Sequence, residues 1–152
     1  YCKNLKTVWW KGKVNRIGVQ CFGATGLEQF CVNAKNIDSC AFIGCEDLKE
    51  IHIRSGVENL NMTAFAMLTG IETICLEGID PDVMEADWVN LQNSTVTIMV
   101  PEDTTDEQLQ LVIQKFASAY IIVNKSQVQK DSCQLSDDPM PDIDGIVGEY
   151  GI

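Results

Sequence analysis

The fold is decided by residues 41–53, which run Ala41-Phe42-Ile43-Gly44-Cys45-Glu46-Asp47-Leu48-Lys49-Glu50-Ile51-His52-Ile53. The second half of this stretch follows the pattern apolar, two residues, apolar, one residue, apolar, with Leu48, Ile51 and Ile53 as the apolar members. Alternate residues of a β-strand point to the same face, so Ile51 and Ile53 are predicted to face a core from one short strand. A unit of this size cannot bury its apolar face alone, and neighbouring units must therefore stack on it.

The same pattern occurs five times along the chain, with central members at positions 8, 30, 51, 74 and 98, which are 21–24 residues apart. A period of about 20–29 residues with an L-x-x-L-x-L core is the signature of leucine-rich repeats. The five copies are Leu5-Val8-Trp10, Leu27-Phe30-Val32, Leu48-Ile51-Ile53, Ile71-Ile74-Leu76 and Thr95-Ile98-Val100.

The residue pattern of residues 37–76 resembles the BspA-like leucine-rich repeats of bacterial and protist surface proteins. A weaker resemblance to the same repeats extends over residues 1–101. Units of that family read roughly A-F-x-x-C-x-x-L-x-x-I-x-I-P-x-x-V. This chain departs from the pattern where Arg54 and Glu77 replace the proline and where Thr95 replaces a leucine. The resemblance implies an α/β fold, a leucine-rich-repeat solenoid with a concave parallel sheet of about five short strands.

The repeat pattern stops after Pro101, where a helix signal begins. Thr105 followed by Gln108 fits a capping box, and Leu109, Val112, Ile113 and Phe116 fall on one helical face. We expect a capping helix over about 105–118 to cover the end of the array, and residues 119–123 to add a final strand. The predicted domain is thus 1–123, followed by an acidic tail over 124–152.

The net charge of −11 argues against a nucleic-acid partner, because binding a phosphate backbone requires a basic surface. The charge is uneven: residues 1–27 contain five basic residues and no acid, whereas residues 131–152 contain six acids and no base. Either the two patches are simply solvated, or the tail folds back on the basic end or docks on a neighbouring copy. No apolar run is long enough to span a bilayer.

The outward-facing residues of the strands predict the binding surface, because solenoids usually bind through the concave sheet. The central outward row is Trp9, Cys31, His52, Cys75 and Met99; the row before it is Thr7, Gln29, Glu50, Thr73 and Thr97; and the row after it is Lys11, Asn33, Arg54, Glu77 and Pro101. From these rows the candidate binding residues are Trp9, Lys11, Asn33, Glu50, His52, Arg54 and Glu77.

Cys31, His52 and Cys75 also have a chemical interpretation, because the repeat would stack them as neighbours. Thiolate and imidazole ligands could hold zinc, and a Cys-His pair could form an activated nucleophile. One argument against the zinc site is that side chains at equivalent positions of adjacent strands point in the same direction, whereas tetrahedral ligands must converge on the metal. An argument against both hypotheses is that cysteine also recurs at structural positions of the chain. The seven cysteines otherwise suit the role of small buried hydrophobes, as expected for Cys2 and Cys45 at equivalent repeat positions.

The leading hypothesis is a non-enzymatic protein-binding or adhesion module that needs no cofactor. The resemblance implies a surface or extracellular location and an unidentified protein ligand. One alternative is a spacer or scaffold segment of a longer repeat protein; another is the Cys/His metal or thiol site. The first unit begins at Tyr1 with an apolar edge, which predicts further repeats or a dimer through that edge.

Overall fold

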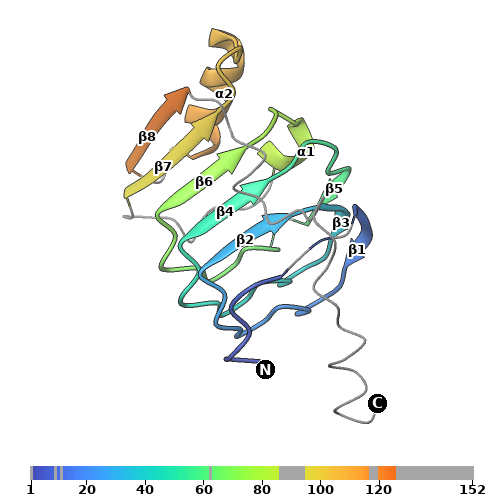
Figure 1. The fold of residues 1–152 in the computed structure, drawn as a ribbon. Coiled ribbons are helices and arrows are strands. Elements are labelled where there is room, and N and C mark those ends of the chain that lie inside the picture. The colour runs from blue at the N-terminus through green and yellow to red at the C-terminus, as the bar shows by residue number, and fades with distance from the viewer. Residues whose placement is uncertain are drawn as a thin grey trace.

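Successive repeat units form a five-stranded parallel sheet in the computed structural model, which describes residues 2–8, 10, 12–61, 63–85, 95–116 and 120–125 (Figure 1). The strand order is β2-β4-β6-β7-β8, so each strand pairs with the next strand of this sheet along the chain. The strands are β2 (Gln29–Val32), β4 (Glu50–Ile53), β6 (Thr73–Leu76), β7 (Thr95–Val100) and β8 (Tyr120–Lys125).

The register of this sheet follows the repeat in the sequence. Ile51 pairs with Phe30 on one side and with Ile74 on the other, and Ile74 pairs with Ile98. All four side chains are at most 4% exposed and belong to the main hydrophobic core. The prediction that the alternate apolar residues point inward is therefore confirmed for β2, β4, β6 and β7.

A second, three-stranded parallel sheet was not predicted from the sequence. It has the order β1-β3-β5, formed by β1 (Val14–Ile17), β3 (Ala34–Ile37) and β5 (Asn59–Leu60). Ile17, Ile37 and Leu60 are in register across it and join the same core as the inward residues of the larger sheet. The signal for this sheet in the sequence is weak, because each strand contributes only two to four residues.

A ladder of phenylalanines stacks the units inside the core. The ring of Phe42 lies parallel to those of Phe22 and Phe65, with centroid distances of 5.5 and 5.2 Å. The backbone follows the same ladder, since the Phe22 N–H donates to Ala41 O and the Phe42 N–H donates to Ala64 O. Each of these phenylalanines follows a small residue, in the pairs Cys21-Phe22, Ala41-Phe42 and Ala64-Phe65, which correspond to the A-F that opens the family pattern. Stacking explains why an aromatic residue recurs there.

The turn after each phenylalanine requires a left-handed backbone conformation. Gly44 has φ +70°, and the equivalent residues Ala24 and Met67 have φ values of +50° and +61°. Glycine adopts this conformation without steric cost, whereas alanine and methionine do not. Cys45, which follows Gly44, is buried with its thiol near Phe22 O and Thr25, whereas Cys2 is exposed, so the prediction of burial holds only for Cys45.

The described residues contain two helices beside the sheets. The short α1 (Pro81–Met84) begins at Asp80, whose side chain accepts from the Asp82 N–H. The longer α2 (Asp106–Lys115) begins with the predicted capping box, in which Thr105 and Gln108 exchange side-chain and backbone hydrogen bonds. Strand β8 follows α2 and pairs in parallel with β7, as expected from residues 119–123.

The predicted apolar face of α2 is only partly correct. Val112 and Phe116 are fully buried and Leu109 is half-buried against the core, but Ile113 is 43% exposed. A helix that touches the core along one narrow stripe buries positions 109, 112 and 116, and Ile113 lies about 100° around the helix from Val112.

The first repeat unit contributes to the core less completely than the later ones. Leu5, Val8 and Trp10 pack against the core but are only half-buried, and Trp10, whose neighbours Trp9 and Lys11 lie outside the described residues, forms a β-bridge. The Trp10 indole Nε1–H donates to Cys31 O at 2.7 Å, so a side chain occupies one acceptor at the β2 edge.

Candidate functional site

The candidate site is the outer face of the five-stranded sheet, which we define as the face opposite the core. Strand alternation puts three rows of residues on this face, each crossing the strands at one register position. The first row runs Gln29, Glu50, Thr73 and Thr97; the central row runs Cys31, His52, Cys75 and Met99. The third row includes Asn33, Arg54 and Glu77, each one residue beyond the end of its strand.

The first row is accessible. Gln29 is exposed, and Glu50, Thr73 and Thr97 are half-buried. These side chains are uncharged or acidic, and they lie about 4.8 Å apart from strand to strand. Together they form a continuous polar strip across β2, β4, β6 and β7.

Three of the four residues of the central row are buried, although they lie outside the main hydrophobic core, whereas Met99 is half-buried. Cys31 is 8% exposed, His52 3% and Cys75 9%, and neither cysteine belongs to the core cluster. Side chains at equivalent positions of adjacent strands shield one another from solvent only at their sides and not from above the sheet. The low exposure therefore distinguishes this row from the first row on the same face.

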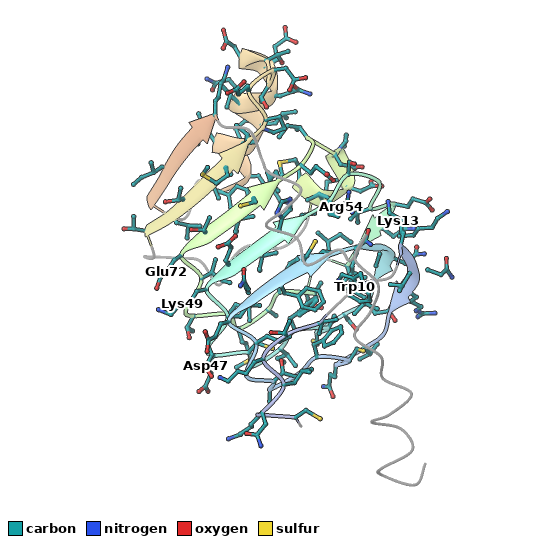
Figure 2. The ribbon with its side chains drawn as sticks, viewed as in Figure 1. Trp10, Lys13, Asp47, Lys49, Arg54 and Glu72 are labelled. Atoms are coloured by element: carbon teal, nitrogen blue, oxygen red, sulfur yellow. The ribbon has the colours of Figure 1, made fainter. Side chains whose placement is uncertain are left out.

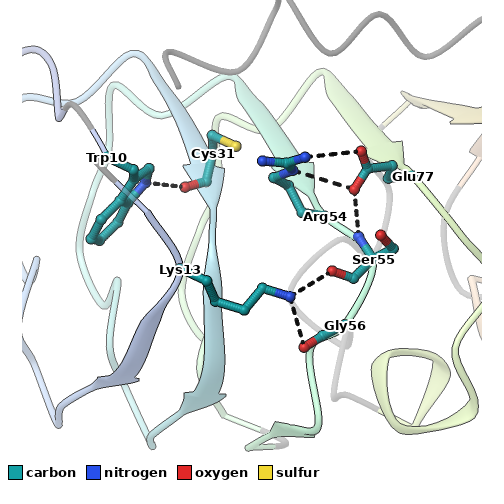
Figure 3. Close-up of polar contacts among 7 residues, drawn as sticks. All are labelled: Trp10, Lys13, Cys31, Arg54, Ser55, Gly56 and Glu77. Carbon is teal, nitrogen blue, oxygen red and sulfur yellow. Dashed lines mark hydrogen bonds and ion pairs between the residues drawn. The ribbon is translucent and has the colours of Figure 1, made fainter. Parts of the chain in front are cut away.

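The third row contains a charged pair on adjacent units. Arg54 donates through Nε and Nη2 to the two carboxylate oxygens of Glu77, at 3.3 and 3.4 Å (Figure 3). The Ser55 backbone N–H also donates to Glu77 Oε2, at 2.6 Å. Burial acts to raise the pKa of Glu77, but the Ser55 N–H and the Arg54 guanidinium outweigh it and hold the pKa below its usual value.

In the ion pairs between repeat units, the basic residue precedes the acidic residue in the chain. This order was not predicted from the sequence. In five of the pairs among the described residues, a basic residue is followed by its acidic partner 22 or 23 residues later, in the next unit, and Lys6 also lies 3.8 Å from Asp47, two units on. Lys49 and Glu72, 2.7 Å apart at the other end of the strands from Arg54, show the arrangement (Figure 2). The pairs are Lys6–Glu28, Arg16–Asp38, Lys35–Glu58, Lys49–Glu72 and Arg54–Glu77.

This order accounts for part of the uneven charge of the chain, because the first units supply cations and the later units supply acids. Four of the five pairs have at least one side chain that is more than half exposed. Such exposed pairs contribute about 0–1 kcal/mol each. Lys13 makes a different bridge between units, donating from Nζ to the carbonyls of Ser55 and Gly56 at 3.0 and 3.2 Å (Figure 3).

The stacking of Cys31, His52 and Cys75 is confirmed by the register of β2, β4 and β6. Their chemistry is that of a poor metal or nucleophile site. Cys31 is disulfide-bonded. Desolvation and the Glu50 carboxylate raise the pKa of Cys75 to about 11. Within the described residues, no group of three or more histidine, cysteine, aspartate or glutamate side chains is arranged to hold a metal ion.

The surroundings of His52 lower the pKa of its imidazole. Burial is the largest cause and Arg54 lowers the pKa further, while Glu77 acts in the opposite direction. A lowered imidazole pKa beside a raised thiol pKa favours the uncharged form of both groups. The central row therefore has the chemistry of a packing surface rather than that of a reactive site.

The structure places the predicted binding residues in different environments. Trp9 and Lys11 lie outside the described residues. Asn33 and His52 are buried, at 4% and 3% exposure. Glu50, Arg54 and Glu77 are half-buried on the outer face, and the last two bind each other.

A polar groove that the sequence did not predict lies beside the second sheet. Its volume is about 910 Å³, and its lining comes from β1, β3, β5 and α1. Asn59 donates to Asn36 Oδ1 at 2.6 Å, and Asn36 donates to Asn15 O at 2.9 Å, so an asparagine ladder crosses the groove. The recurrence of asparagine at 15, 36 and 59 was the available signal.

The parallel sheets and the period of the units define an α/β repeat protein of the leucine-rich-repeat class. The comparison with known families agrees: the BspA-type leucine-rich-repeat region matches residues 1–86, in six copies. The chain belongs to this family, as the resemblance in residues 37–76 indicated. The family match counts six copies up to residue 86, whereas the sequence pattern predicted five units up to residue 100.

Leucine-rich-repeat domains generally mediate protein interactions and are generally not enzymes, and those of the BspA type are typically associated with surfaces. No match was found among curated proteins or among solved structures. In the part of the chain that the structure describes, no helix has the length and apolar character needed to cross a membrane.

Proposed function

We propose that this chain is a protein-binding or adhesion module of a surface or secreted protein, and that it binds through the outer face of the five-stranded sheet. In this proposal residues 1–123 are one solenoid, the outer face is its concave side, and α2 with β8 caps its C-terminal end. Residues 124–152 are an acidic tail outside the solenoid.

The observation that carries the proposal is the continuous polar strip of Gln29, Glu50, Thr73 and Thr97. Regular strands hold these side chains at fixed spacing, so a partner meets a preorganised surface and loses little conformational entropy in ordering it. The buried pair of Phe116 and Val112 in α2 supports the capping role, because it extends the core beyond the last repeat.

A pair of matched double variants tests the proposal on a panel of purified extracellular proteins. The Gln29→Glu/Glu50→Arg variant replaces the single negative charge of the strip with a pair of opposite charges on the adjacent strands β2 and β4. The control, Lys35→Glu/Glu58→Lys, reverses an ion pair of 3.0 Å that does not lie on the outer face.

We expect the strip variant to weaken any panel interaction of the wild-type chain by tenfold or more, and the control to leave it within about twofold. Equal binding by all three proteins would move the site away from the outer face. If the wild-type chain binds no protein of the panel, and both variants are as stable as the wild type, the spacer or scaffold alternative would be favoured.

A further inference from the structure

We propose that the polar groove beside the second sheet binds a neutral oligosaccharide. Its volume of about 910 Å³ is in the range of sites for small ligands, and its lining comes from β1, β3, β5 and α1. All of its lining residues lie in the described part of the chain. Because the groove belongs to a different sheet from the polar strip of the outer face, the inference does not depend on the proposed protein-binding function.

The floor of the groove is a regular grid of polar side chains on β1, β3 and β5. Arg16, Asn36 and Asn59 are in register across the three strands, and each precedes a buried core residue that faces the other way. Asp38 and Asn61, two residues after Asn36 and Asn59, also line the groove and form a second row. A ligand therefore meets guanidinium, amide and carboxylate groups at a strand-to-strand spacing of about 4.8 Å.

Hydrogen bonds within the grid hold its side chains in place. Asn59 Nδ2 donates to Asn36 Oδ1 at 2.6 Å, and Asn36 Nδ2 donates to the backbone carbonyl of Asn15 at 2.9 Å. Arg16 Nε donates to Asp38 Oδ2 at 2.7 Å. A side chain that is already fixed loses little conformational entropy on binding, so the grid is preorganised for a ligand.

The same side chains retain donors and acceptors for a ligand. A side-chain amide has two N–H donors and a carbonyl oxygen with two lone pairs. Among the described residues, Asn59 uses one N–H within the grid, so its second N–H and its carbonyl oxygen remain. Arg16 uses Nε, and its two terminal nitrogens remain as donors. A sugar hydroxyl both donates and accepts, which matches a surface that offers both kinds of group side by side.

The charge of the groove disfavours an anionic ligand. The Arg16–Asp38 ion pair compensates itself, and α1, which packs against β5, adds the exposed carboxylates of Asp82 and Glu85 to the lining (Figure 1). A glycan that carries sulfate, phosphate or carboxylate groups would be repelled by this excess of negative charge, whereas a neutral glycan would not.

The spacing of the grid disfavours an extended peptide along a row. An extended chain repeats the backbone groups on one side every two residues, about 6.8 Å apart, whereas the row offers its groups about 4.8 Å apart. Such a peptide would lose register with the row after the first contacts. Val19, which also lines the groove and is 59% exposed, adds an apolar surface for the C–H face of a sugar ring.

NMR titration of the isotopically labelled chain tests the site directly. The probes are maltotetraose, cellotetraose and mannotetraose, each added to about 10 mM, since a few hydrogen bonds give dissociation constants of about 1 mM. We expect the side-chain amide signals of Asn36 and Asn59 to shift with at least one probe. The signal of Asn4, an exposed asparagine outside the groove, should stay in place. Unmoved Asn36 and Asn59 signals with all three probes would overturn the proposal.

Matched variants locate the binding. Asn59→Leu removes the hydrogen-bonding groups at similar size and should weaken the saccharide affinity tenfold or more. Asn4→Leu makes the same change at an exposed position outside the groove and should leave the affinity within about twofold. The Gln29→Glu/Glu50→Arg strip variant should also bind the saccharide like the wild type. Unchanged affinity in Asn59→Leu, or lost affinity in the strip variant, would place the saccharide elsewhere and overturn the proposal.

Tetralysine distinguishes a neutral from a cationic ligand. Asp82 and Glu85 could attract a basic peptide, but they lie on α1 and not on the amide grid of the floor. We expect tetralysine to leave the Asn36 and Asn59 amide signals in place. Shifts of these signals with tetralysine, and with none of the saccharides, would identify a site for basic peptides and overturn the proposal.

Discussion

The guanidinium of Arg54 donates two hydrogen bonds to the carboxylate of Glu77 in the adjacent repeat unit, with N···O distances of 3.3 and 3.4 Å. Their side chains are only 22% and 14% exposed, whereas each of the other ion pairs between units has at least one side chain that is more than half exposed. This pair therefore differs from a surface ion pair, because water screens it less and because the Ser55 N–H shares the same carboxylate.

We expect Glu77→Gln to lower the free energy of unfolding by about 1–2 kcal/mol, since it weakens charged hydrogen bonds in a half-buried setting. The matched control is Glu72→Gln, which removes the exposed partner of Lys49 and should cost about 0.5 kcal/mol or less. Urea denaturation at neutral pH measures both. Equal effects of the two substitutions would contradict the special role of Glu77.

The Glu77 contribution should also depend on pH. The folded-state pKa of Glu77 lies below its usual value, so its stabilisation is present above the unfolded pKa and is lost as the pH falls through the folded pKa. The difference in unfolding free energy between the wild type and Glu77→Gln should therefore shrink in acid. A constant difference from pH 7 to the acid limit of folding would argue against the charged form as its source.

His52 should destabilise the fold in mild acid. Burial lowers the pKa of the imidazole in the folded state, whereas in the unfolded state it titrates near 6.5. The unfolded chain then binds more protons, and stability falls as the pH drops below about 6.5. His52 is the only histidine of the chain, so its titration can be followed alone by NMR.

Two variants separate this effect from others. His52→Gln should remove the loss of stability between pH 7 and pH 5.5, where the nearby Glu77 stays charged. Glu77→Gln removes a carboxylate that acts to raise the pKa of His52, so the NMR pKa of His52 should fall in this variant. An unperturbed His52 pKa in the wild-type chain would contradict the burial of the row.

The phenylalanine ladder should be most sensitive at its centre. Phe42 is fully buried between Phe22 and Phe65, whereas Phe22 is half-buried. Phe42→Ala should cost about 3–5 kcal/mol through lost burial and the cavity that it leaves. Phe22→Ala should cost less, and Phe42→Leu should recover much of the loss. Chemical denaturation ranks the three, and equal costs for Phe42→Ala and Phe22→Ala would contradict a central position for Phe42.

The left-handed turn residues give a prediction that is independent of packing. A Cβ on Gly44 would meet only the Ala24 side chain at 3.9 Å, so Gly44→Ala should cost about 1 kcal/mol, from its φ alone. Met67→Gly should stabilise the protein by about 0.5 kcal/mol or more, since Met67 is 60% exposed and has φ +61°. Opposite signs in thermal denaturation are the expected result, and loss of stability in Met67→Gly would contradict it.

Much of the fold could be predicted because the same apolar pattern recurs in several units. Phe30, Ile51, Ile74 and Ile98 recur at a nearly constant spacing, and parallel pairing then fixes which residues are neighbours. The strand of the first unit stays a prediction, since Trp9 and Lys11 lie outside the described residues. The second sheet was missed because strands as short as Asn59–Leu60 carry too few residues for a recognisable pattern.

The sequence by itself determined the repeat period, the inward apolar rows, the capping box at Thr105 and the stacking of Cys31, His52 and Cys75, because each is a property of local spacing. Only the tertiary structure decided which outward residues are accessible. Accessibility depends on what packs over a face, so His52 proved buried and Gln29 exposed on the same side of one sheet. The pairing of Arg54 with Glu77 likewise depends on side-chain reach between units, which repeat spacing does not specify.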